Sequence, residues 1–524
     1  MDAAPHPEAE GPATEASPPA ASSPDALSVS SPDALSVSSP GSLSVSSPDA
    51  LSASSPDSLS VSSRPSPPAT PHPTFGEALR TWLRIGCLGF GGPAGQIALM
   101  HRTVVDEKRW VDDARFLHAL NYCTLLPGPE AQQLATYVGW LLHRTAGGIA
   151  AGTLFVLPGF CVVMALSFIY AAYRQIPAID ALFWGLKPAV LAVVLEALLR
   201  VGRRSLRNGF SLALAGGAFA ALFAFGVPFP AVVFGAGLLG WLRARYAPAT
   251  GGGEGAGASH APAGKGTDPA SAPPAAIRDM PEHTRPSTAR ALRVLATWLP
   301  LWLGPVLLLG LLLGWDNVYT RMGVFFSKMA VVTFGGAYAV LAYVAQQAVQ
   351  AHGWLTAADM LGGLALAETT PGPLILVLQF VGYLAAWNSP GALPPVLAGL
   401  LGATLTVWVT FTPCFLWIFL GAPYIEAVRG RPALAAALAG VTAAVAGVIA
   451  NLSVWFGLHV LFGTISTWDG PIGLRLPLPV LSSLDPVAAL LAVGAGVAML
   501  RFKAPMLPVL AACAVLGAVI RLTL

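Results

Sequence analysis

The amino-acid sequence predicts an all-α polytopic membrane protein made of two inverted-topology repeats of about six helices each. Of its 524 residues, 55% are hydrophobic and only 10% are charged, whereas about 25% of the residues in soluble domains are charged. Many windows of about 20 residues are almost free of charge, and an apolar helix of this length spans a bilayer. The third observation is an internal duplication of the apolar part, which predicts the two repeats.

The duplication is carried by glycine- and proline-rich interruptions of the apolar segments. Gly91-Gly92, Trp110 and Pro127-Gly128-Pro129 recur as Gly335-Gly336, Trp354 and Pro371-Gly372-Pro373. Each counterpart lies 244 residues further along the chain (335 − 91 = 244), without a gap. Interrupted apolar segments at matching positions of two halves indicate the binding site of a secondary transporter.

The chain divides into five parts. These are a low-complexity tail at 1–72, the first repeat at 73–246, a flexible linker at 247–293, an extra connecting helix at 294–314 and the second repeat at 315–524. The tail repeats an eight-residue unit of the type Ser-Pro-Asp-Ala-Leu-Ser-Val-Ser. Because such a composition buries too little apolar surface to offset the entropy of ordering, we expect the tail to be disordered. It lacks the basic start and the apolar run of a signal peptide.

The expected membrane segments follow the same order in both repeats. They lie at about 75–102, 113–142, 146–172, 179–202, 208–225 and 228–244, and then at about 319–349, 357–387, 392–421, 431–460, 483–499 and 504–523. Six spans return the chain to its starting side, so the extra helix makes the second repeat enter from the opposite face. The sequence therefore predicts a 6+1+6 arrangement with roughly 13 spans and inverted repeats.

Basic residues in the expected loops indicate the orientation. Arg144, the cluster from Arg200 to Arg207 and the pair Arg243 and Arg245 all fall on the side of the N-terminal tail. The positive-inside rule then places this tail in the cytoplasm and the chain in the inner (plasma) membrane. Lys108 and its basic neighbours are exceptions, and they fit better if the first segment is re-entrant.

The interruptions themselves favour an anion. A helix that restarts after Pro93, or begins at Pro127 or Pro129, directs unpaired N–H groups and a positive dipole end at the break. The same holds for Pro371 and Pro373 in the second half. Close packing of small residues and a plain kink are the structural alternatives. If the two N-termini face each other, they form a concave site for a small tetrahedral oxyanion.

The expected substrate site adds amides and cations to the breaks. Its residues are Arg84, Gly91, Gly92, Gln96, Asn121, Pro127, Gly128, Pro129, Gln132, Lys187, Lys328, Gly335, Gly336, Pro371, Gly372 and Pro373, with Gln133 nearby. Arg84 and Lys328 precede the two Gly-Gly pairs by seven residues each, and snorkelling to the headgroups is the alternative explanation for both. Lys187 lies inside an apolar run and therefore needs a partner.

Two carboxylates are candidates for proton coupling. Glu130 follows the first Pro-Gly-Pro break, where capping of the helix start is an equally good explanation. Glu368 precedes the second break, where a helix C-terminus and burial both disfavour a negative charge. We therefore favour Glu368 as the proton carrier.

Other functional classes lack their sequence signals. The five cysteines show no CxxC spacing, so we expect neither a metal site nor disulfides nor a cofactor. The net charge of +3 is too small to indicate nucleic acid. Gly264-Lys265-Gly266-Thr267 lacks the spacing of a P-loop. We expect no enzymatic activity.

The motifs at the breaks resemble those of the chromate ion transporter family. The resemblance lies in Gly89-Phe90-Gly91-Gly92-Pro93-Ala94-Gly95-Gln96, in Leu126-Pro127-Gly128-Pro129-Glu130-Ala131-Gln132-Gln133, in Thr333-Phe334-Gly335-Gly336-Ala337-Tyr338 and in Glu368-Thr369-Thr370-Pro371-Gly372-Pro373. It implies a long, two-domain inner-membrane carrier that expels chromate and confers resistance. Ala342, where a proline is expected, and the repetitive tail depart from the pattern.

These observations lead to one functional prediction and its alternatives. The sequence predicts a secondary active transporter that exports chromate and is coupled to protons. A transporter of sulfate or another oxyanion and a passive anion channel remain alternatives. The expected partners are a chromate or sulfate anion and the lipid bilayer, without nucleic acid, and a homodimer is left open.

Overall fold

Helices make up most of the computed structural model, which describes residues 72–246, 282–334, 337–424 and 432–523. The first half contains α1 (Phe75–Leu88), α2 (Gly92–His101), the π-helix η1 (Arg102–Glu107), α3 (Asp113–Cys123), α4 (Glu130–Tyr173), α5 (Pro177–Ser205), α6 (Gly209–Phe223) and α7 (Phe229–Tyr246). Between the halves lie η3 (Glu282–Thr284) and α8 (Thr288–Leu313). These elements belong to one unit, Ser66–Leu524.

The second half repeats this order of elements. It contains α9 (Val318–Val332), α10 (Ala337–Gln346), the π-helix η4 (Gln347–Ala351), α11 (Ala357–Thr369), η5 (Leu374–Leu376), α12 (Val377–Asn388), α13 (Pro395–Gly421), η6 (Ala422–Tyr424), α15 (Pro432–Leu461), α16 (Pro486–Leu500) and α17 (Met506–Thr523). Single π-helical turns are rare in proteins, yet η1 and η4 occupy corresponding positions. The duplication read from the motifs therefore extends to local backbone structure.

Each half contains a tight helical hairpin built on glycine. α4 is divided at His143 and Arg144, whose backbone angles are not helical, and its two parts pack where Gly139 meets Gly147. In the second half α12 and α13 pack in the same way, where Gly382 meets Gly402. A Cβ atom at any of these glycines would overlap with the facing backbone, so the absence of a side chain permits the close approach.

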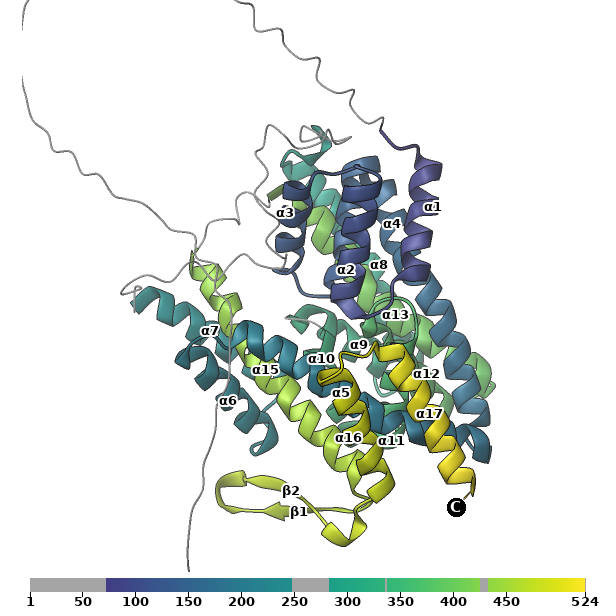
Figure 1. Ribbon diagram of the computed structural model, residues 1–524. Helices are drawn as coiled ribbons and strands as arrows, with labels where there is room; N and C mark the ends of the chain where they lie inside the picture. Colours follow the sequence, from purple (N-terminus) through teal and green to yellow (C-terminus); the bar gives the residue numbers. More distant parts are fainter. Residues whose placement is uncertain (1–71, 247–281, 335–336, 425–431, 524) are drawn as a thin grey trace, which may run out of the picture. The chain divides into compact units, whose positions relative to one another are not determined.

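The long helices are exchanged between the halves. α5 of the first half packs along α16 and α17 of the second, while α15 of the second half packs along α6 and α7 of the first (Figure 1). Glycines sit at both contacts: Gly185 lies against Gly517, and Gly440 lies against Gly240. The halves therefore form one interlocked unit.

Six helices are long and apolar enough to cross a membrane: α4, α5, α8, the α13–η6 segment, α15 and α17. α6, α16 and the η5–α12 segment are shorter apolar helices. The expected single spans 75–102 and 319–349 are each divided into two short helices at the breaks. α8 carries exposed leucines, including Leu311 and Leu312, as expected for a helix that faces lipid.

The fold is not purely helical, which corrects the all-α prediction in one detail. β1 (Ile465–Asp469) and β2 (Arg475–Pro479) form an antiparallel hairpin between α15 and α16, with Ile465 opposite Pro479. The hairpin was missed because its second strand contains Pro477 and Pro479, and proline is depleted in strands.

Candidate functional site

The interruptions of the apolar segments have the backbone conformations that glycine allows. α1 ends at Leu88, and α2 begins only after Gly91, whose φ is 85°. Gly128 and Gly372, the central residues of the two Pro-Gly-Pro turns, have φ values of 118° and 98°. Side chains rarely adopt these angles. Each turn is followed directly by a new helix, at Glu130 and at Leu374.

Each Pro-Gly-Pro turn is bonded to the opposite half of the chain. The N–H of Gly128 donates a hydrogen bond of 2.9 Å to the carbonyl of Thr333, at the end of α9. The N–H of Gly372 donates a hydrogen bond of 3.0 Å to the carbonyl of Gly89, at the end of α1. Donors and acceptors are both separated by 244 residues, so the two bonds are equivalent. The structure therefore brings the four interruptions together as two reciprocal pairs.

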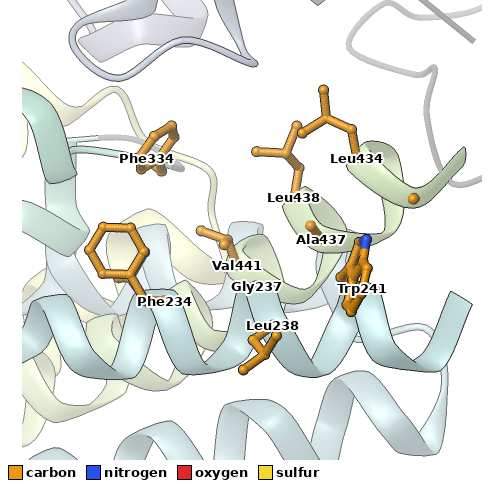
Figure 2. Close-up of a pocket in the computed structure, with 11 residues that line it drawn as sticks. Phe234, Gly237, Leu238, Trp241, Phe334, Leu434, Ala437, Leu438 and Val441 are labelled. Atoms are coloured by element: carbon orange, nitrogen blue, oxygen red, sulfur yellow. The ribbon is translucent and has the colours of Figure 1, made fainter. Parts of the chain in front are cut away.

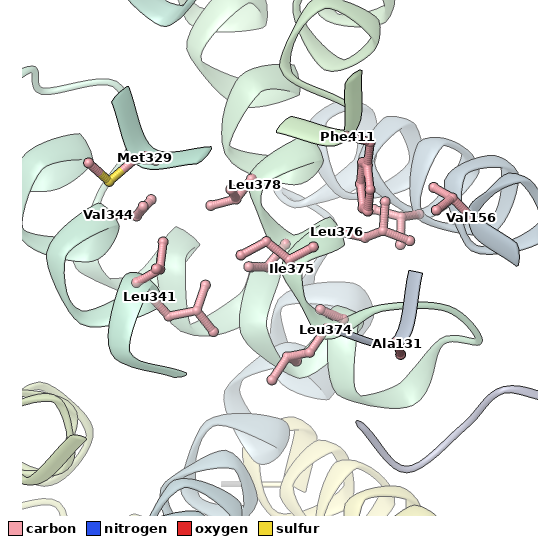
Figure 3. Packing of buried hydrophobic residues seen from close by; sticks show 14 of the residues in the cluster. Ala131, Val156, Met329, Leu341, Val344, Leu374, Ile375, Leu376, Leu378 and Phe411 are labelled. Carbon is pink, nitrogen blue, oxygen red and sulfur yellow. The ribbon is translucent and has the colours of Figure 1, made fainter. Parts of the chain in front are cut away.

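Kinked helices of the opposite half support the turns. Gly372 packs against Gly159, next to Pro158 in the second part of α4, and Gly128 packs against Cys414, next to Pro413 in α13. Figure 3 shows the apolar packing around the second turn, where Leu374, Ile375 and Leu376 lie among side chains of α4, α10 and α13. This packing fixes the position of the helix start after the turn.

Glutamines make the two halves chemically unequal. Gln96 is fully buried, and its Nε2 donates to the carbonyls of Gly372 at 2.5 Å and Gly89 at 3.1 Å. Its counterpart 244 residues later is Val340, which has no donor. Gln133 Nε2 donates to the carbonyl of Pro127 at 2.7 Å, and Gln132 Nε2 donates to Thr136. Among the described residues, the side-chain amides that donate to the breaks come from the first half, and Gln96 serves the turn of the second half as well.

The side-chain oxygens of these three amides are buried without a partner among the described residues. Within the described residues, Oε1 of Gln96, Gln132 and Gln133 accepts no hydrogen bond. Buried polar atoms in native proteins are usually hydrogen-bonded. Together with the first N–H groups of α4 and η5, which lack intrahelical acceptors, these atoms leave polar capacity for a ligand or water at the breaks.

The two carboxylates lie beside the breaks in different surroundings. Glu368 is buried, and Tyr338 Oη donates a hydrogen bond of 2.6 Å to its Oε1. Glu130 is half-buried at the start of α4. Two arginines near the end of α5 interact electrostatically with these groups, Arg204 with Glu130 and Arg200 with Glu368, although Arg200 is also ion-paired with Glu196.

Among the described residues, no hydrogen bond or ion pair joins the three expected cations to the breaks. Arg84 and Lys328 are exposed at corresponding positions of α1 and α9. Lys187 is half-buried in α5 and lines a separate cavity of about 430 Å³ between α5, α15 and α16. Asn121 is half-buried in α3. Gly335 and Gly336 lie outside the described residues.

A second cavity, of about 570 Å³, is apolar. Phe234, Leu238 and Trp241 of α7 and several residues of α15 line it, and Phe334 at the second break closes one side (Figure 2). Such a lining cannot replace the hydration of a divalent oxyanion. Among the described residues, no group of three or more His, Cys, Asp or Glu side chains could hold a metal ion.

Several residues of this region were missed by sequence reasoning. Arg200 and Arg204 were read only as loop charges, and Tyr338 only as part of a motif. The contacts of Gly159 and Cys414 could have been suspected, because the prolines before them match at a constant offset of 255 residues (413 − 158 = 255). Spacing cannot reveal that each of these residues serves the turn of the other half.

Interrupted helices, long apolar spans and interruptions bonded between the two halves are the features of a multi-pass membrane protein of the transporter class. A family model described as "Chromate transporter" matches residues 76–241 and 320–518. The chain belongs to the chromate transporter family, which confirms the resemblance seen in the motifs and the prediction that the chain is not an enzyme.

Three relatives share most of their length with this chain. It is 31% identical over 389 residues to the chromate transport protein of Pseudomonas aeruginosa, covering 73% of this chain and 81% of that one. It is 29% identical over 395 residues to the chromate transport protein of Cupriavidus metallidurans, covering 74% and 85%. It is 25% identical over 435 residues to the probable chromate transport protein of Synechococcus elongatus, covering 80% and 96%. No solved structure matches the chain.

Replacement of Gln96 by valine, the residue of the second half, tests its role at the break. We expect Gln96→Val to destabilise the protein by about 1–3 kcal/mol, because the buried carbonyl of Gly372 loses its side-chain donor. Thermal unfolding of the detergent-solubilised protein measures this loss. Gln350→Val removes an exposed glutamine and serves as the control. Equal melting of Gln96→Val and the wild type would show that the amide does not hold the break.

Proposed function

We propose that this protein is a secondary active transporter that exports chromate across the inner (plasma) membrane and couples this export to protons. The observation that carries the proposal is the reciprocal pairing of the interruptions, in a chain of the chromate transporter family. Relatives in this family are named chromate transport proteins. The arginine-rich ends of α5 and α7 would face the cytoplasm.

The starts of α4 and η5 would bind the oxyanion. Both follow a Pro-Gly-Pro turn, and the prolines at Pro129 and Pro373 leave the next N–H groups directed toward the break. Free N–H groups and the positive end of a helix dipole stabilise an anion. Chromate has four oxygens in a tetrahedral arrangement, so it can accept hydrogen bonds from two helix starts at once.

Alternation of the two halves would expose this site to each side in turn. Each pair of interruptions is held by one backbone hydrogen bond between the halves and by one close glycine contact. If the repeats are inverted, breaking one pair opens one side, and breaking its equivalent opens the other. Gln96 adds side-chain hydrogen bonds only to the pair formed by Gly372 and Gly89, so the two open states would differ in free energy.

Cations would act along the route to the breaks. Arg84 and Lys328 are exposed two helical turns before the interruptions, so an anion can meet them only in a water-filled approach. A charge within an apolar helix is tolerated where it faces such a path. Arg200 and Arg204 of α5 would attract the anion from the cytoplasmic side.

Glu368 would carry the coupled proton. Its carboxyl group is buried next to the second Pro-Gly-Pro turn and has the hydroxyl of Tyr338 as its hydrogen-bond partner. Burial of a carboxyl group favours its neutral form. Protonation would therefore remove a negative charge from the neighbourhood of a bound dianion. Glu130 is the second candidate, and Arg204 would hold its charge.

Oxyanion flux in proteoliposomes tests the proposed function. We expect chromate to accumulate against its own gradient when a pH gradient is imposed, and to move faster than sulfate or molybdate. Chromate that only equilibrates would identify a passive anion channel. Faster movement of sulfate would identify a sulfate carrier and contradict chromate as the preferred substrate.

Glu368→Gln tests the proton step separately from anion binding. The amide keeps a partner for Tyr338 but cannot exchange a proton, so we expect flux in a pH gradient to fall to the level seen without one. Exchange of chromate for chromate should persist. Glu107→Gln, at an exposed position of η1, should respond like the wild type. An undiminished response of Glu368→Gln to the gradient would exclude Glu368 as the carrier.

A further inference from the structure

The cavity that contains Lys187 lies at the opposite end of the bundle from the arginine-rich helix ends. Its walls come from the first half of α5, the last turn of α15, η8 (Leu481–Ser483) and the start of α16. The N-terminal end of α15 packs instead on α7 near Gly240, shortly before Arg243 and Arg245. α15 ends at Leu461 and the hairpin follows, so the cavity opens where the apolar spans give way to polar chain.

Lys187 and Asp485 both line the cavity, from α5 and from the start of α16, and among the described residues no ion pair joins them. Asp180, in the first turn of α5, is ion-paired with Arg521 of α17 at 3.0 Å. Oδ1 of Asp485 accepts hydrogen bonds from the N–H groups of Val487 and Ala488, and so it caps α16. The cavity therefore has one basic and one acidic residue on different walls.

The other walls suit the boundary of a bilayer. Trp184 lines the cavity, and tryptophan is enriched at membrane interfaces. α16 also has exposed apolar side chains, among them Leu490 and Val493, which are 73% and 64% exposed. Apolar surface for lipid chains is therefore present on the helix that begins at the cavity.

We propose that this cavity binds the headgroup of a zwitterionic aminophospholipid. The lipid phosphate would accept charge-assisted hydrogen bonds from Lys187, and its primary ammonium group would donate to Asp485. His459 also faces the cavity, with its Nδ1 2.9 Å from the carbonyl of Trp455, so its orientation is fixed by its own helix. This lipid would link α5 of the first half to α15 and α16 of the second half. It gives Lys187 a ligand other than the transported anion.

Native mass spectrometry of the purified full-length protein tests the assignment. After exhaustive detergent washing, we expect one phosphatidylethanolamine to stay bound per chain, and more tightly than phosphatidylglycerol or phosphatidylcholine. Lys187→Gln and Asp485→Asn should each weaken its retention about tenfold or more, the loss expected for one charge-assisted hydrogen bond. Asparagine caps a helix as well as aspartate does, so Asp485→Asn removes the charge and keeps the cap.

Two further variants control for folding and for charge. Lys187→Arg keeps the phosphate contact and should retain the lipid. Arg501→Gln removes an exposed cation at the other end of α16 and should not change lipid retention.

Equal retention of the three lipids, or unaltered retention in both Lys187→Gln and Asp485→Asn, would overturn the proposal. Displacement of the lipid by millimolar sulfate or phosphate would identify a site for free oxyanions instead. None of these outcomes depends on chromate flux, which can fail or succeed independently.

Discussion

Two backbone hydrogen bonds between the halves, from Gly128 to Thr333 and from Gly372 to Gly89, are the interaction on which the rest of the structure depends. An interrupted helix in a membrane exposes N–H and C=O groups that lipid cannot satisfy. Here the N–H group of each Pro-Gly-Pro turn binds a carbonyl of the other half. Each half therefore depends on the other for part of its backbone hydrogen bonding. The pairing also ties each turn, and the helix start that follows it, to the end of a helix in the other half.

The exchange of long helices makes this pairing possible. α5 packs on the last two helices of the second half, and α15 packs on the last two helices of the first half (Figure 1). Glycines at Gly185 and Gly440 allow these contacts to be close. The same scaffold carries Arg200 and Arg204 toward the two acids beside the breaks, while it carries Lys187 to a separate cavity. α5 therefore carries Arg200 and Arg204 at one end and lines the cavity of Lys187 nearer its other end.

Much of this arrangement was predictable from the sequence, because local chemistry decides it. The offset of 244 residues identifies the two halves, and Pro-Gly-Pro can only begin a helix or interrupt one. The partners of the breaks were not predictable, since spacing along the chain does not say which half supplies the acceptor. Lys187 was expected at the breaks but lines a separate cavity. The packing of α5 against α16 and α17 places it there, and the sequence does not reveal that tertiary packing. The asymmetry at Gln96 is visible in the sequence, as Val340 stands at its counterpart, but its meaning depends on the contact with Gly372.

A disulfide between the first turn and the second half tests the central claim most directly. A Cβ atom at Gly128 would lie 2.9 Å from Sγ of Cys414, which is within reach of a disulfide. The chain would carry Gly128→Cys, serine at the other four native cysteines and a protease site within residues 247–281. After oxidation and cleavage, the two halves should migrate together on a non-reducing gel and separate on reduction. Gly226→Cys, also at a positive φ but with no atom within 4 Å, is the matched control. Halves that separate as readily in Gly128→Cys as in this control would contradict the reciprocal pairing.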